Sequence, residues 1–158
     1  MALWVVRFIN SDDFVSHAID WVTNSLFDHV EMGTPEGTWI GAHAGSGIQE
    51  RVANYCVPTR ERRYALPCSD YQLATILASA RRDIGIPYNY EGIIGLLLHS
   101  RNFTDEHRDF CSQWMMKKSE LFEDLALLNV AAGWEYLVTP ETLHLSPKFR
   151  GHLVFSKG

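Results

Sequence analysis

Cys111 is the residue whose type and position most favour nucleophilic chemistry. It follows a polar segment and opens a run, Cys-Ser-Gln-Trp-Met-Met, that is typical of a helix start. A thiol reacts as its thiolate, which a helix N-terminus and a neighbouring histidine both stabilise. The free N–H groups of a first helical turn can also stabilise an oxyanion. Position alone also fits the commoner role of a small buried apolar residue, which we assign to Cys56 and Cys68.

His29 is the candidate base for this thiol. It lies in a strand-like run, and alternation puts it on one face with Glu31. A turn at residues 33–37, centred between Glu36 and Gly37, places His29 opposite residue 44 of the next strand and so makes His43 a neighbour. A third polar group must orient the base and fix its tautomer. His43 fits this role, although a solvent-facing strand position explains it equally well.

Zinc chemistry is the alternative use of the same residues. Two histidines and one cysteine could ligate zinc and leave a fourth position open. Cys111, His29 and His43 lack the tight paired spacings of common zinc sites, so we expect no metal and no cofactor. The chain also lacks the glycine-rich phosphate loops and the GxSxG pattern, which removes nucleotide-binding and serine-hydrolase functions from consideration. Surface positions are expected for the remaining histidines: His17, His99, His107, His144 and His152.

Composition indicates one ordinary globular domain over residues 1–158. Hydrophobic residues make up 46% of the chain and charged residues 21%, values close to those of soluble proteins. The net charge of -5 and the scattered basic residues argue against nucleic-acid binding. The three cysteines have no paired spacing, so a disulfide framework is not expected.

No membrane span or export signal is expected. The longest uncharged apolar stretch, residues 92–98, is far shorter than the roughly 20 residues that cross a bilayer. The first ten residues lack a basic segment before their apolar run, and Arg7 interrupts that run, which is typical of a strand rather than a signal peptide. We therefore expect a cytoplasmic location as synthesised, with no integral membrane segment.

The first half of the chain should form the sheet that positions His29. Residues 3–9 are rich in Val, Ile and Trp and predict a strand, and residues 11–23 carry apolar side chains at helical spacing. Short strand-like runs separated by Gly and Pro turns over residues 28–52 predict an antiparallel meander. A further strand at residues 62–66 is expected to close this sheet.

The second half should supply helices, one of which presents Cys111. Ser69 and Gln72 have the spacing of a capping box, which predicts a helix that ends near Gly85. A short apolar segment predicts a helix at residues 90–98. A polar loop at residues 100–107 and a helix from about residue 110 to 122 are expected to follow. A last strand is expected at residues 152–155.

Taken together, these segments resemble the circularly permuted branch of the NlpC superfamily of papain-like cysteine amidases. The family's Gly-x-Pro-Tyr stretch is matched by residues 85–88, and its cysteine helix by Phe-Cys-Ser at residues 110–112. The histidine strand, Phe-Asp-His-Val-Glu-Met at residues 27–32, comes first here, which is the permuted order. The Thr-Pro-Glu-Thr-Leu segment at residues 139–143 also matches, and the resemblance covers most of the chain.

The resemblance implies an α+β, papain-like fold in which an antiparallel meander packs against helices, and it implies roles for the residues. Cys111 would attack an amide or ester carbonyl, His29 would activate it, and His43 would orient His29. Tyr88 and Tyr90 would line the substrate groove, unless they are buried structural residues. Gln113 departs from the acid often found in relatives, and the third position varies among relatives, so Gln49, Glu50 and Glu31 are alternatives to His43.

Three functions remain open at this stage. The first is a thiol amidase or peptidase, for which bacterial cell-wall peptide is the family's most familiar substrate. The second is a lipid or acyl ester hydrolase or acyltransferase, because the permuted branch also resembles lecithin-retinol acyltransferase-like enzymes. The third is a non-catalytic binding or virion-associated module. A cell-wall enzyme without a signal peptide would reach its target through lysis, a phage particle or specialised secretion.

Overall fold

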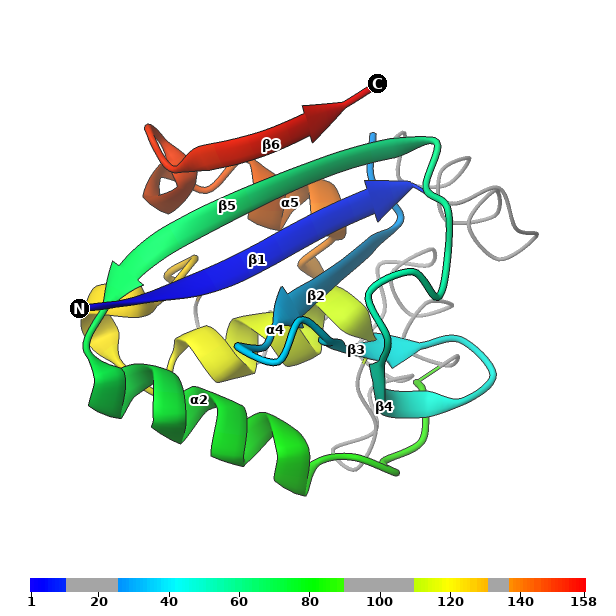
Figure 1. Ribbon diagram of the computed structural model, residues 1–158, viewed down its shortest axis with the longest axis horizontal. Coiled ribbons are helices and arrows are strands. Elements are labelled where there is room, and N and C mark those ends of the chain that lie inside the picture. The colour runs from blue at the N-terminus through cyan, green and yellow to red at the C-terminus, as the bar shows by residue number, and fades with distance from the viewer. Residues whose placement is uncertain (11–25, 90–109, 131–136) are drawn as a thin grey trace.

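The protein has a mixed α+β fold built on one antiparallel sheet of six strands in the order β4-β3-β2-β1-β5-β6 (Figure 1). This computed structural model describes residues 1–10, 26–89, 110–130 and 137–158. The strands are β1 (Ala2–Asn10), β2 (His29–Gly33), β3 (Trp39–His43), β4 (Gly47–Arg51), β5 (Arg60–Cys68) and β6 (Leu153–Lys157). The α-helices are α2 (Asp70–Arg82), α4 (Cys111–Ser119) and α5 (Pro140–His144), and the 3₁₀ turns are η2 (Glu123–Leu125) and η4 (Pro147–Phe149).

The meander predicted over residues 28–52 is confirmed as strands β2, β3 and β4, but its register differs by one residue from the prediction. Met32 pairs with Ile40 and Gly33 with Trp39. Extended to the first residue of β2, this register would put His29 opposite His43. The loop holds three residues between Thr34 and Thr38, closed by a Thr34 N–H to Thr38 carbonyl bond of 2.9 Å, with Gly37 at a φ of 81°. A glycine in this left-handed conformation is typical of three-residue hairpin loops.

The strand at the outer edge of the sheet is not the one that the sequence predicted. The segment predicted to close the sheet is β5, which lies inside it, antiparallel to β1 on one side and to β6 on the other. The C-terminal strand β6 forms the edge of the described sheet instead, as the red arrow in Figure 1 shows. The sequence predicted both segments as strands, and β5 simply extends further in each direction, from Arg60 to Cys68.

Helix α2 confirms the predicted capping box. The Ser69 hydroxyl accepts from the Gln72 N–H at 3.1 Å, and the Gln72 side chain accepts from the Ser69 N–H at 2.8 Å. The predicted cysteine helix is also present, although it ends at Ser119 rather than near residue 122. The helices predicted at residues 11–23 and 90–98, and the loop at 100–107, lie outside the described residues. Within the described ranges, no helix is both long and apolar enough to span a bilayer.

The two faces of the sheet have different chemistry. On one face Val6, Val30 and Met32 are fully buried and belong to the same core cluster as Trp114 of α4. Helix α4 packs against β2 and β3, and it also contacts α2 and α5. Because side chains alternate along a strand, the odd-numbered residues of β1 and β2 point to the opposite face, where polar side chains meet. Because α4 packs against β2, Cys111 lies on a helix that is in direct contact with the strand bearing His29.

The segment that carries the Gly-x-Pro-Tyr stretch is held on the edge strand β4. The Ile48 N–H donates to the Ile86 carbonyl at 2.9 Å, and the Gly85 N–H donates to the Ile48 carbonyl at 2.9 Å. Gly47 makes this approach possible, because a Cβ atom there would lie 2.2 Å from the Ile86 carbonyl oxygen. This contact directs the chain after α2 back toward the core.

Candidate active site

Cys111 and His29 are brought together at the beginning of β2. Cys111 is the first residue of α4, and its Sγ lies 3.8 Å from the carbonyl oxygen of Asp28, the residue before His29. Cys111 is also near enough to the His29 imidazole to be one of the groups that raise its pKa. A nucleophile type and a base type that are 82 positions apart in the chain thus meet at one place.

The first turn of α4 adds groups that can stabilise negative charge. The N-cap residue, Phe110, has an extended backbone and provides no side-chain cap. The N–H groups at the start of a helix have no carbonyl partner within the helix, and the helix dipole makes this end positive. Cys111 lies in this turn, so both its sulfur and any oxyanion formed beside it would lie in a favourable field.

Burial and the neighbouring polar groups have opposite effects on the pKa of His29. Burial lowers the pKa of His29, but the interactions with Cys111 and Glu31 outweigh this effect and raise the pKa from its ordinary value of 6.5 to about 10. The imidazole is therefore protonated at neutral pH. A cysteine beside a histidine is the pairing that many thiol enzymes use for nucleophilic catalysis.

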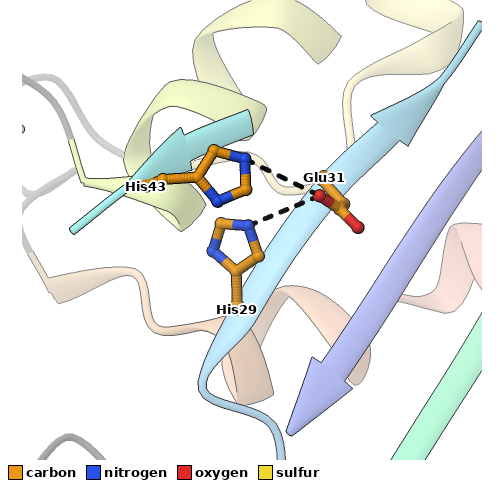
Figure 2. A group of neighbouring side chains, drawn as sticks. All are labelled: His29, Glu31 and His43. Atoms are coloured by element: carbon orange, nitrogen blue, oxygen red, sulfur yellow. Dashed lines mark ion pairs between the residues drawn. The ribbon is translucent and has the colours of Figure 1, made fainter. Parts of the chain in front are cut away.

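Glu31 is a second polar group that faces His29, as Figure 2 shows. Its Oε2 lies 3.6 Å from His29 Nε2, and both side chains come from the same face of β2, as their alternation predicts. The carboxylate is fully buried and held from two other sides. Tyr55 donates its hydroxyl to Oε2 at 2.9 Å, and the Arg7 guanidinium contacts Oε1 at 3.0 Å.

His43 packs against His29 and also faces Glu31. The two imidazole rings are 4.7 Å apart at their centroids, and His43 Nε2 lies 3.9 Å from Glu31 Oε2. Burial, followed by the charges of His29, Arg51 and Arg7, lowers the pKa of His43 from 6.5 to about 2, so this ring is neutral at physiological pH. His43 is thus adjacent to the candidate base, as the sequence predicts, but the nearest charged partner of that base is Glu31.

Gly41 leaves room for this arrangement on β3. A Cβ atom at position 41 would lie 2.9 Å from the Glu31 Cβ and 3.2 Å from His29 Nε2. The first distance is shorter than Cβ contacts found in proteins, and the second is tighter than most. Any side chain at this position would therefore displace Glu31 or the imidazole.

The other residues singled out in the sequence lie in different surroundings. Tyr88 is buried in the same core cluster as Cys111, and Tyr90 lies outside the described residues. Glu50 accepts from Thr38 at 2.5 Å and pairs with Arg81 of α2 at 3.2 Å, and Gln49 accepts from Arg51 at 3.1 Å. The roles predicted for Tyr88, Tyr90 and the third polar residue stay predictions.

His144 departs from the surface position expected for it. It packs between the rings of Phe8 and Phe27, with centroid distances of 5.3 and 4.6 Å, and its Nε2 lies 2.8 Å from the Tyr64 hydroxyl. The Thr-Pro-Glu-Thr-Leu segment, for which no helix was predicted, forms most of helix α5, and the last residue of this helix contacts aromatic rings of β1 and the segment before β2. His144 is therefore partly buried against aromatic side chains rather than free on the surface.

Sequence reasoning missed the residues that hold Glu31. Arg7 is 1% exposed, contacts Glu61 at 3.0 Å as well as Glu31, and lies 4.8 Å above the ring of Trp39. Tyr55, which follows β4 in an irregular segment, was not considered either. The available signal was a lone arginine at an inward position of an apolar strand, since a buried charge needs partners of opposite sign.

Access to the thiol is restricted in this conformation. Cys111 is 2% exposed and the His29 side chain 13%. A surface cavity of about 460 Å³ lies between residue 35 and α2, but its lining includes neither Cys111 nor His29. A substrate carbonyl can therefore reach the sulfur only after the groups that cover it have moved.

Comparison with known proteins supports the fold but not a family. No protein-family model matches the chain, and no curated protein sequence matches it. A solved structure with a similar fold is described as the crystal structure of metalloprotein yiiX from Escherichia coli O157:H7, DUF1105. The match covers 99% of this chain and 96% of that chain, with a TM-score of 0.62 and 14% sequence identity. At this identity, the likeness extends to the fold alone.

Proposed function

We propose that this protein is a papain-like cysteine hydrolase of permuted chain order that cleaves an amide or peptide bond. The observation that carries the proposal is the position of Cys111, which lies in the first turn of α4 with its sulfur 3.8 Å from the carbonyl oxygen of Asp28, the residue before His29. A buried thiol that served only as packing would need no imidazole beside it. The order of the chain, with the histidine strand before the cysteine helix, agrees with the permuted papain-like pattern.

In the proposed reaction, His29 holds the proton of the Cys111 thiol before substrate binds. The thiolate attacks the carbonyl carbon, and the N–H groups at the start of α4 stabilise the resulting oxyanion. The intermediate collapses when His29 donates its proton to the leaving amine, which departs and leaves an acyl-thioester on Cys111. Water then attacks the thioester, His29 takes one of its protons, and the carboxylic acid and the free thiol are released.

Glu31 takes the role of orienting His29 in this proposal. A carboxylate at 3.6 Å from Nε2 stabilises the protonated imidazole and limits its rotation. Arg7 and Tyr55 in turn fix the carboxylate. His43, which sequence reasoning assigned to this role, supports one side of the His29 ring and has no net charge with which to stabilise an imidazolium.

The substrate class is tested by presenting two panels to the purified protein. Cell-wall muropeptides and phospholipids are incubated separately with wild type and with Cys111→Ala, and the products are identified by mass spectrometry. We expect peptide-bond cleavage of muropeptides by the wild type only. Products from phospholipids alone would instead assign the thiol to lipid esters, and absence of products from both panels would favour a non-catalytic module.

A further inference from the structure

The side chains of His29, Glu31 and His43 form a cluster of metal-ligating atoms on neighbouring strands. One nitrogen from each histidine and one carboxylate oxygen lie within 4.8 Å of one another. In Figure 2 both imidazoles direct a nitrogen toward the same oxygen of Glu31, so the three donors surround one point. Two imidazoles and one carboxylate are a common donor set for zinc and other divalent transition metals, with further positions left for water.

The two imidazole nitrogens that face Glu31 are buried and have no hydrogen-bond partner among the described residues. His43 is 7% exposed, and among the described residues its Nε2 has no hydrogen-bond partner. The Nε2 atom of His29 is also buried without a hydrogen bond. A buried polar atom without a partner is unfavourable, and a cation between these atoms would satisfy them together.

The surroundings of Glu31 resemble the outer shell of a metal site. Metal-binding carboxylates are usually fixed by hydrogen bonds from neighbouring groups, which orient them toward the ion. Tyr55 provides such a hydrogen bond to Glu31, and Arg7 provides an ion pair. Because Arg7 also pairs with Glu61, its positive charge is shared between two carboxylates, and Glu31 retains negative charge for a second cation.

We propose that His29, Glu31 and His43 bind one divalent transition-metal ion, for which zinc is the probe, and that this ion inhibits the thiol chemistry of Cys111. The ion replaces the proton on His29 Nε2, so the ring keeps at most the proton on Nδ1 and cannot form an imidazolium. Glu31 is drawn to the ion at the same time and ceases to stabilise the base. The binding itself is independent of the proposed hydrolase function, whereas the inhibition rests on it.

Calorimetric titration of zinc into the metal-free, reduced protein tests the binding. We expect one zinc ion per chain, and the same stoichiometry in Cys111→Ala, because the sulfur is not a ligand. His43→Ala and Glu31→Gln should each weaken binding by at least about tenfold, since each removes a ligand or its charge. His152→Ala, which alters a partly exposed histidine on a different part of the chain, is the matched control and should bind as the wild type does.

X-ray absorption spectroscopy of the zinc-loaded wild type provides a readout that does not depend on whether a variant folds. The expected nearest shell holds nitrogen and oxygen only. A sulfur neighbour, loss of binding in Cys111→Ala, or absence of a stoichiometric site in the wild type would overturn the inference. Circular dichroism of each variant identifies any loss of binding that comes from unfolding, and such a variant is replaced by His43→Gln.

The inhibition is measured separately from the binding. Added zinc should abolish turnover by the wild type, and a chelator should restore it. Stoichiometric binding without any turnover in the metal-free protein would contradict the proposed hydrolase function and leave the metal site standing. Turnover that persists when the site is saturated with zinc would overturn the inhibition and leave the hydrolase function standing.

Discussion

Replacement of Cys111 by alanine should reduce turnover by about a thousandfold or more, because no other described group can replace the thiolate in forming the acyl-enzyme. Helix α4 should remain folded. Removal of one buried sulfur atom costs about 1 kcal/mol of packing free energy, which lowers the melting temperature of a domain of this size by roughly 2–4 °C. The rate is measured on the substrate that the panels identify, together with the melting temperature of each protein.

Cys68→Ala is the matched control for this substitution. Cys68 is 6% exposed, so the same atom is removed from a similarly buried position at the end of β5. It has no imidazole beside it among the described residues, and its variant should keep wild-type turnover. If Cys111→Ala retained turnover, or if both variants lost it equally, Cys111 would not be the nucleophile.

Replacement of Arg7 by methionine should reduce the free energy of unfolding by about 3–5 kcal/mol, because it leaves the buried Glu31 carboxylate without its cation and Glu61 with Arg63 alone. The Arg7 guanidinium contacts Glu31 and Glu61 at 3.0 Å each, and all three side chains are almost completely buried. Methionine fills much of the same volume, so the loss reflects charge rather than a cavity. Urea unfolding followed by fluorescence measures the difference.

Neutralisation of the carboxylates in the same variant separates charge from packing. A protein carrying Arg7→Met with Glu31→Gln and Glu61→Gln should recover part of the lost stability, since removing a whole buried ionic network costs less than removing one member. Arg82→Met, at an exposed position at the end of α2, should change stability by less than about 1 kcal/mol. A loss of similar size in Arg7→Met and Arg82→Met would contradict the importance of the buried network.

Much of this sheet could be predicted from the sequence because local patterns determine it. The alternation around His29 and the turn residues between β2 and β3 predicted the hairpin, and the capping box of α2 was confirmed in both of its hydrogen bonds. The position of Cys111 at a helix start was also predicted correctly. Each of these features depends on residues within a few positions of one another.

The register of the hairpin shows how one local detail controls the site. A loop centred between Glu36 and Gly37 would put His43 on the opposite face from His29, because neighbouring positions on a strand alternate. The three-residue loop shifts the register by one position, so His43 faces His29 directly. Composition alone does not distinguish these two loops, since both accept glycine at position 37.

The support around Glu31 could not be predicted because it depends on contacts that are distant in the sequence. Arg7, Tyr55 and Glu61 come from β1, from the irregular segment after β4 and from β5. Their convergence follows from the strand order, in which β1 lies between β2 and β5. The lone arginine of β1 could have indicated a buried ion pair, a signal that was not used, and nothing local identified its partners.

The reaction of Cys111 with iodoacetamide, in the wild type and in His29→Ala, tests most directly whether thiol and imidazole act as one unit. Both proteins are metal-free and reduced, at pH 7 and low reagent concentration, so that the chemical step limits the rate, and mass spectrometry follows each cysteine. A thiol without a partner is only a few per cent ionised at this pH, so loss of the imidazole should slow Cys111 by at least about tenfold and leave Cys56 unchanged. Equal rates for Cys111 in the two proteins would contradict the account.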